Sequence, residues 1–145
     1  SNIRTAPIVT TAQVSSTAFD LKTVKIGDVV GGFVISNISA AMSSVPFSRE
    51  NNVRVEFIGT TTIQGKYVIS QMAGEDLLVI TPEEGARLPH VGDPSVLLCL
   101  GIPPTVQWDI HDGEMVRVVI SKYDVMRSNG DGCGYGGFVI SFSKS

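Results

Sequence analysis

The residues of this chain that are best suited to metal or acid–base chemistry crowd into the segment WDIHDGE. Trp108, the only tryptophan, is followed by Asp109, His111, Asp112 and Glu114. Residues two apart in an extended backbone point to the same side, so Asp109 and His111 are expected to lie on one side of the segment. Such nitrogen and oxygen ligands can hold zinc, and one hypothesis is a small metal-dependent enzyme that uses Asp109, His111 and Glu114. An exposed polar turn ending in an Asp–Gly pair is the simpler interpretation, with these five side chains as a binding surface.

A second polar segment is the glycine-rich stretch RSNGDGCGYGG. Asn129 and Asp131 resemble half of a calcium loop, but the alternating acids and the distal glutamate of such a loop are missing. A strand follows rather than a helix, so aligned backbone amides for a phosphate are not expected. The Asn–Gly and Asp–Gly pairs favour a hairpin connection. Because long glycine-rich tips are often binding surfaces, Asn129, Asp131 and Tyr135 are candidate binding residues.

The two cysteines admit two interpretations. Cys99 lies in the apolar run VLLCLG, where a buried free thiol would be ordinary, and Cys133 lies in the glycine-rich segment. In an exported domain the pair could form a disulfide that closes about 35 residues, which stabilises a fold by roughly 3–4 kcal/mol in the chain-entropy model. Neither cysteine has the CxxC spacing or the neighbouring histidine that would lower its pKa, so no nucleophilic role is predicted.

Signatures of other chemistries are missing from the sequence. It contains no G-x-S-x-G, no H-E-x-x-H, no Walker loop and no dinucleotide-binding fingerprint opening a helix. The second histidine, His90, lies between a proline and a turn and is predicted to be a solvated loop residue. The sequence therefore favours a protein that is not an enzyme, and no cofactor is expected.

Composition and charge narrow the class of protein. Apolar residues make up 43% of the 145 positions and charged residues 17%, which is typical of a packed globular domain. The net charge of -3 offers no basic footprint for a polyanion, so a nucleic-acid partner is not expected. No apolar run approaches the length of a membrane-spanning helix.

The N-terminal segment differs in composition from the rest of the chain. The opening Ser–Asn pair is typical of the remnant of a purification tag, and the following residues are rich in Thr, Ser and Ala. Residues 1–18 are therefore predicted to be a tag remnant and a flexible tether, with residues 19–145 forming a single β domain. The alternative is that Ile8 and Val9 begin an edge strand. A tether of this kind is compatible with a lipid anchor upstream and predicts a periplasmic, cell-surface or secreted location.

Apolar alternation predicts strands along most of the chain. The segments VRVEFIG and TTIQGKYVIS alternate with the period of two of a half-buried strand and are joined at Gly59–Thr60 by a hairpin or a sharply coiled continuation. Two short apolar runs follow, and EMVRVVISKYDVM and GYGGFVISF are expected to form a terminal hairpin. The predicted core residues are Val53, Val55, Phe57, Tyr67, Val79, Leu98, Val118 and Ile140.

A single helical signal occurs at ITPEEGARLP. Thr81 suits the N-cap and Pro82 the first helical position, while Glu84 sits where the acid of a capping box is found. One short helix near residues 82–88 is predicted, and its carboxylates are explained by the helix dipole rather than by catalysis.

The hexamer GGFVIS occurs twice, at residues 31–36 and 136–141. The flanking sequences differ, so the repeat predicts two similar strands rather than a duplicated domain. Their paired glycines permit a turn, a bulge or a close approach of strands.

These elements together predict an all-β domain of about seven to eight mainly antiparallel strands, either an OB-like barrel or a β-sandwich. The strand order counted from residue 53, with the helix after the third strand, favours the barrel. The predicted function is a non-catalytic module outside the cytoplasm, which binds a protein or a small ligand or scaffolds an envelope or surface assembly.

Overall fold

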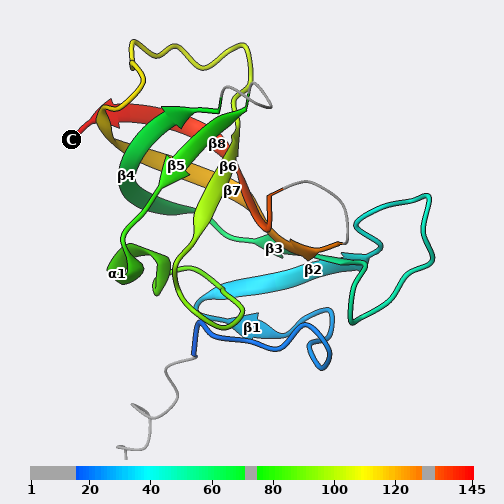
Figure 1. The fold of residues 1–145 in the computed structure, drawn as a ribbon. Helices are drawn as coiled ribbons and strands as arrows, with labels where there is room; N and C mark the ends of the chain where they lie inside the picture. Colours follow the sequence, from blue (N-terminus) through cyan, green and yellow to red (C-terminus); the bar gives the residue numbers. More distant parts are fainter. Residues whose placement is uncertain (1–15, 71–74, 129–132) are drawn as a thin grey trace, which may run out of the picture.

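The structure is a computed structural model that describes residues 16–70, 75–128 and 133–145. Within these residues it contains eight strands and one short helix, which confirms the all-β prediction. The elements are β1 (Val29–Val30), β2 (Phe33–Ser39), β3 (Val53–Ile58), β4 (Thr61–Ile69), β5 (Asp76–Val79), α1 (Pro82–Gly85), β6 (Leu97–Gly101), β7 (Met115–Arg127) and β8 (Tyr135–Lys144) (Figure 1).

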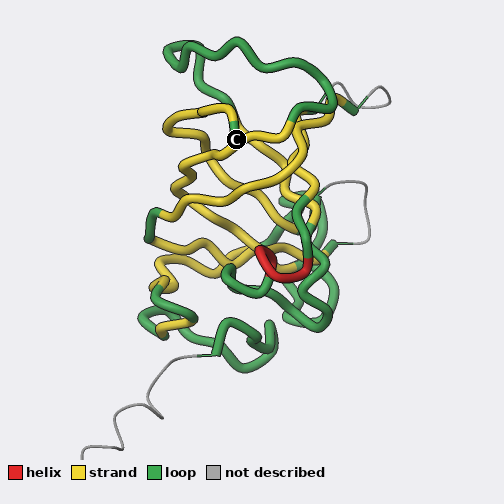
Figure 2. Tube along the Cα trace, turned by 90° about the vertical axis from the view of Figure 1, so that its left-hand side faces the viewer, coloured by secondary structure: helices red, strands yellow, loops and turns green. Residues whose placement is uncertain are grey.

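Five of the strands close into a barrel, in the order β7, β4, β5, β6, β8 and back to β7 (Figures 1 and 2). All pairings in the ring are antiparallel except the one between β6 and β8, which is parallel. The expected terminal hairpin is present, because β8 runs antiparallel along β7. The closed ring decides between the two predicted architectures in favour of the OB-like barrel.

The remaining strands extend from the barrel in the order β3, β2, β1. β3 and β4 both run antiparallel to β7 and pair with successive parts of it. Gly59–Thr60 therefore links β3 and β4 as a coiled continuation rather than as a hairpin. A side chain at Gly59 would overlap the ring of Phe33. The ring therefore begins at β4 and not at residue 53, and α1 lies between its second and third strands.

A single apolar core fills the barrel and continues beneath the outer strands. Six of the eight predicted core residues are buried in it: Val53, Val55, Phe57, Tyr67, Leu98 and Val118. Their alternation along β3, β4, β6 and β7 places every second side chain inside, as the period of two requires.

Two predicted core residues are on the outer surface. Val79 is 46% exposed and Ile140 is 51% exposed, whereas their neighbours Leu78 and Val139 are buried. In both strands three apolar residues follow one another, so composition does not indicate which parity faces the core. The pairing with β4, β6 and β7 sets that parity.

The helix is shorter than residues 82–88, since α1 ends at Gly85 and a turn leads to Leu88. Thr81 is the N-cap and accepts a hydrogen bond from the backbone N–H of Glu84, as predicted. The Glu84 carboxylate does not complete a capping box: it accepts from the backbone N–H of Gln64 at 2.8 Å and from Arg87 at 2.7 Å. It therefore fastens the helix to β4.

The two GGFVIS copies form strands with different roles. Gly31 and Gly32 have φ values of +57° and +89° and form the turn between β1 and β2, where positive φ at both positions suits a hairpin. Gly136 and Gly137 lie within β8, where a side chain at Gly136 would overlap the Asp124 carboxylate. β2 and β8 are not neighbours in the sheet, so one hexamer serves two unrelated positions.

His90 is not a solvated loop residue, because it is only 6% exposed. Its Nδ1 lies 2.9 Å from the carbonyl oxygen of Leu88, and its backbone N–H donates to the carbonyl of Thr17 at 2.9 Å. Thr17 also donates through its hydroxyl to the Ala86 carbonyl, so this end of the expected tether lies against the domain.

Residues 1–15, including Ile8 and Val9, lie outside the described residues. None of the helices that the structure describes has the length and apolar character needed to cross a membrane.

Candidate functional site

A long connection between β6 and β7 crosses one end of the barrel and carries the predicted WDIHDGE residues (Figure 1). Trp108 packs there against Tyr67 and Phe142, with a ring-centre distance of 5.4 Å to each. Tyr67 is fully buried, whereas Trp108 is 38% exposed. The indole therefore both closes this end of the core and presents an aromatic surface to solvent.

Beneath the indole, the Tyr67 hydroxyl donates a hydrogen bond to the carboxylate of Asp76. Burial raises the pKa of Tyr67 well above its usual range, and the hydrogen bond to Asp76 raises it further. The phenol thus stays protonated and acts as a structural donor at this end of the barrel.

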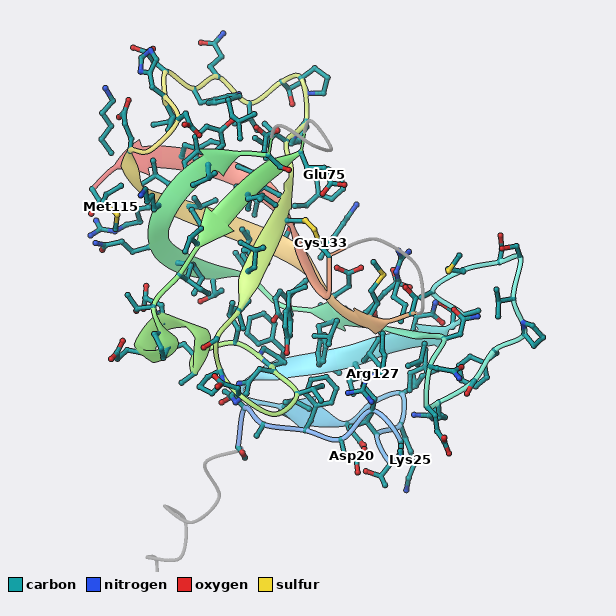
Figure 3. All side chains as sticks on the ribbon, viewed as in Figure 1. Asp20, Lys25, Glu75, Met115, Arg127 and Cys133 are labelled. Carbon is teal, nitrogen blue, oxygen red and sulfur yellow. A yellow bond between two sulfur atoms is a disulfide. The ribbon has the colours of Figure 1, made fainter. Side chains whose placement is uncertain are left out.

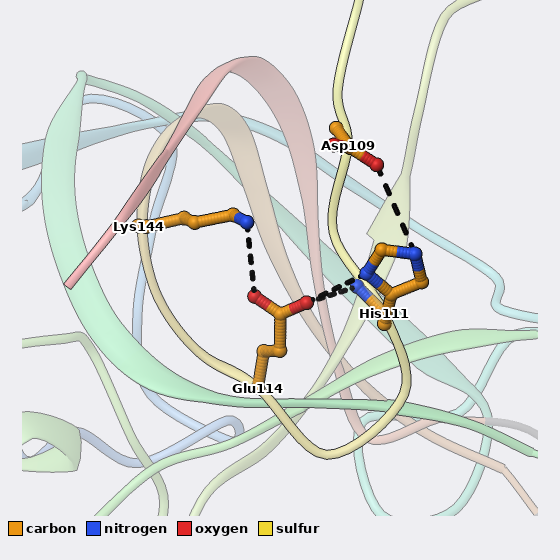
Figure 4. Close-up of polar contacts among 4 residues, drawn as sticks. All are labelled: Asp109, His111, Glu114 and Lys144. Atoms are coloured by element: carbon orange, nitrogen blue, oxygen red, sulfur yellow. Dashed lines mark hydrogen bonds and ion pairs between the residues drawn. The ribbon is translucent and has the colours of Figure 1, made fainter.

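The charged residues of the segment gather beside Lys144, near the end of β8 (Figure 4). His111 Nδ1 lies 2.8 Å from Glu114 Oε1, which also accepts the backbone N–H of His111 at 3.0 Å. Lys144 Nζ is 3.7 Å from the other Glu114 oxygen. The hydrogen bonds from the His111 side chain and backbone lower the pKa of Glu114.

The arrangement bears directly on the metal hypothesis. His111 Nε2 faces Asp109 at 3.8 Å, while the opposite ring nitrogen faces Glu114. Asp109 and His111 are therefore close to one another. A cation bound to either nitrogen would have only one of the two carboxylates beside it, because the ring separates them. The three side chains form a chain of polar contacts rather than a convergent ligand set.

Asp112 has a backbone partner. Its carboxylate accepts the N–H of Ile69 at 2.8 Å, and the following Gly113 has a φ of +90°. The Gly113 N–H in turn donates to the Tyr67 carbonyl at 2.7 Å. Asp112 and Gly113 thus form the turn that leads the chain into β7 and attach it to the end of β4.

Tyr135, the predicted binding residue of the glycine-rich segment that the structure describes, does not join this cluster. Tyr135 is half-buried at the start of β8, stacked on Tyr123 with ring centres 6.4 Å apart. Its hydroxyl accepts the backbone N–H of Val91 at 3.0 Å. Asn129 and Asp131 lie outside the described residues. Within the described part of the chain, Tyr135 has a packing role.

Cys99 and Cys133 form a disulfide between β6 and the segment that enters β8. Their Cα atoms are 5.9 Å apart, which suits a disulfide. Because β6 and β8 are the parallel pair of the ring, the bridge lies across the seam at which the C-terminal strand closes the barrel.

A groove of about 550 Å³ opens where the barrel meets the outer strands. β7 pairs with β4 up to Ile120 and with β3 from Asp124 onward. Residues 121–123 therefore face the break between these two partner strands. Lys122 has a φ of +50°, in the left-handed region that side chains rarely adopt. The lining includes Ser36, Glu56, Ile58, Thr60, Ser121 and Lys122.

Glu56 and Lys122, two charged residues of the groove lining, differ in their polar partners. The Glu56 carboxylate accepts a hydrogen bond from the Asn37 side chain at 2.8 Å. The Lys122 ammonium lies 5.3 Å from the ring centre of Phe138, an exposed aromatic residue on β8. No ion pair joins Lys122 to a carboxylate in the part of the chain that the structure describes. Among the described residues, the groove lining thus combines Lys122 and the Glu56 carboxylate with hydroxyl groups and the apolar side chain of Ile58.

Sequence reasoning did not identify this groove, although β7 contains a signal for it. Val116, Val118 and Ile120 are buried at even positions, whereas Tyr123 and Val125 are buried at odd ones. A change of parity within one strand indicates an extra residue, and here that residue is part of the bulge at Lys122. The contributions of β2 and β3 to the lining have no comparable signal in the sequence.

Comparison with known proteins adds no assignment. No protein-family model matches the chain, and neither a curated protein nor a solved structure matched it. The function is therefore inferred from the geometry of the groove and from the disulfide.

Proposed function

We propose that this protein is a non-catalytic β module that binds a small anionic ligand outside the cytoplasm. The observation that carries the proposal is the groove at the β7 bulge, where Lys122 adopts a left-handed backbone conformation. Unfavourable backbone conformations of this kind cost of the order of 1–3 kcal/mol and cluster at ligand sites. A volume of about 550 Å³ is within the range of small-molecule sites.

The chemistry of the lining supports an anionic ligand. Lys122 is the cationic residue among the described lining residues, while Thr60 and Ser121 supply hydroxyl groups. The carboxylate of Glu56 accepts a hydrogen bond from the Asn37 side chain and keeps its negative charge, so the acidic group of a bound ligand is expected at Lys122 rather than beside Glu56. A ligand with one acidic group and several hydrogen-bonding groups fits this set best.

Binding is a better match to these residues than catalysis. Ser36 donates its hydroxyl to the Glu56 backbone carbonyl at 3.1 Å, and the groove-lining residues include no histidine or cysteine that could activate a nucleophile. The location outside the cytoplasm is supported by the disulfide, since such bonds persist in oxidising compartments.

A thermal-shift series would test the proposal. Inorganic phosphate, short mono- and dicarboxylates and sugar acids would be titrated against the full chain at constant ionic strength. We expect at least one of these anions to raise the thermal midpoint saturably, since a ligand that binds only the folded state stabilises it. Lys122→Gln should abolish the shift.

Lys66→Gln is the matched control, because Lys66 is exposed on β4 and is not part of the groove lining. This variant removes the same charge and should keep the full response. The proposal is wrong if none of the anions stabilises the protein, or if Lys122→Gln and Lys66→Gln respond alike.

A further inference from the structure

A second cluster of reactive side chains lies on the flank of the barrel, away from the groove lining (Figure 3). Glu75 Oε2 is 3.3 Å from the sulfur of Cys99 and 3.4 Å from the sulfur of Cys133. Within the described ranges, these three form the group of His, Cys, Asp or Glu side chains whose ligand atoms come within 4.8 Å of one another. One carboxylate oxygen therefore faces both members of the cysteine pair.

The barrel holds the three side chains in place. Leu77 in β5 pairs with Cys99 in β6, and Cys99 pairs in turn with Gly136 in β8. Glu75 directly precedes β5, where its carbonyl accepts the N–H of Ser70 at 2.8 Å. Because neighbouring strands fix these backbone positions, the side chains remain together when the bond between the sulfurs is broken.

We propose that Cys99, Cys133 and Glu75 form a binding site for a thiophilic divalent cation such as Zn²⁺ when the disulfide is reduced. An external dithiol supplies two electrons and two protons and becomes a disulfide, or a phosphine together with one water molecule becomes the phosphine oxide. In either case the S–S bond breaks and two thiols are left. Cation binding then displaces one proton from each thiol. The resulting ligand set is two thiolates and one carboxylate, with solvent water as the fourth ligand.

The distances suit tetrahedral coordination. With zinc–sulfur bonds of about 2.3 Å and zinc–oxygen bonds of about 2.0 Å, neighbouring sulfur and oxygen ligands lie about 3.5 Å apart. The two Glu75–sulfur distances, 3.3 Å and 3.4 Å, are slightly shorter than this. The sulfurs themselves must move apart to about 3.8 Å. Rotation of the cysteine side chains can provide that separation over a Cα–Cα distance of 5.9 Å.

The surroundings allow a cation to enter. Glu75 is exposed and both cysteines are partly exposed, so the ion, the reductant and the water ligand reach the cluster from solvent. The oxidised protein ties the start of β8 to β6 by a covalent bond, and the reduced protein with its cation ties the same positions by coordination. The site thus holds a disulfide when it is oxidised and a metal ion when it is reduced. It shares no residue with the described groove lining and is independent of ligand binding there.

Cobalt titration of the full chain would test this site. The protein is reduced with a phosphine, freed of reductant without oxygen and titrated with Co²⁺. We expect binding of one equivalent, with the near-ultraviolet charge-transfer band of thiolate ligands, and displacement by Zn²⁺. Unreduced protein should bind none, and Cys133→Ser should lose the band. Glu75→Gln should weaken binding about tenfold or more while keeping the band.

Glu83→Gln provides the matched control, since Glu83 is an exposed carboxylate on α1. It should bind cobalt as the unaltered protein does. Circular dichroism of each reduced variant separates loss of the site from loss of the fold, and Zn²⁺ should raise the thermal midpoint of the reduced protein only. Absence of one-to-one binding would overturn the proposal, as would a Glu75→Gln variant of unchanged affinity.

Discussion

At the scale of single residues, the barrel places two tyrosine hydroxyls where neither can ionise easily. Tyr67 donates to Asp76, and Tyr123 donates to the Pro89 carbonyl at 2.7 Å; both side chains are fully buried. Burial raises the pKa of Tyr67 and of Tyr123 well above the ordinary value near 10. In each case the folded state holds a proton that the unfolded state releases.

This difference predicts the alkaline limit of the fold. Below a pH of about 10 both states keep the protons, so the two groups leave the free energy of unfolding unchanged. Above it, the unfolded chain releases protons that the folded chain retains, and stability falls as the pH rises. Phenolate absorbance should therefore show two of the three tyrosines ionising only together with the loss of the far-ultraviolet β signal. Ionisation of all three in the intact fold would contradict this account.

At the scale of elements, the single helical turn depends on a glycine that intrinsic propensity disfavours. Alanine is about 1 kcal/mol better than glycine within a helix. A side chain at Gly85, however, would overlap the backbone carbonyl oxygen of Pro94, and a backbone atom cannot move aside as the end of a flexible side chain can. The close approach of the Pro94 carbonyl therefore favours glycine at position 85.

Gly85→Ala is therefore expected to destabilise the protein, although it improves the helix. Overpacking typically costs about 1–3 kcal/mol, which exceeds the gain in propensity. Urea unfolding should give a lower midpoint with an unchanged slope. Glu83→Ala, on the exposed side of the same helix, should change the midpoint little. A Gly85→Ala protein more stable than the parent would show that the loop at Pro94 yields readily.

At the scale of the whole molecule, the C-terminal strand closes the barrel and the disulfide lies at the closing seam. β8 pairs with β7 on one side and with β6 on the other, and Cys133 lies two residues before its start at Tyr135. The bridge closes 34 residues of chain, which stabilises the fold by about 3–4 kcal/mol in the chain-entropy model. The ring is thus held by backbone pairing and by one covalent link.

Cys133→Ser should accordingly lower the free energy of unfolding by a few kcal/mol while leaving the β circular dichroism spectrum recognisable. The bridge is absent from this variant, but all five barrel strands keep their partners. Protein produced through an export pathway should show no free thiol under denaturing conditions without reductant, and two after reduction. Two free thiols before reduction would remove the bridge and with it the support that it lends to export.

Local features of the chain were predictable because their causes are local. Alternation of Val53, Val55 and Phe57 follows from the period of a strand. Thr81 is an N-cap because its oxygen can accept an N–H three residues on, and the terminal hairpin joins strands that follow one another in the chain. An all-β domain with one short helix could therefore be predicted from the sequence.

The barrel closure, the burial of short apolar strands and the reactive clusters depended on contacts between distant residues. Leu78 is buried and Val79 exposed because of the register with β4 and β6, which no local pattern specifies. Glu75 meets Cys99 and Cys133 only because β5, β6 and β8 are consecutive in the ring. The sequence alone determined the periodicity of each strand; the tertiary structure decided which strands are neighbours, because non-local pairing depends on the sum of many weak contacts across the sheet.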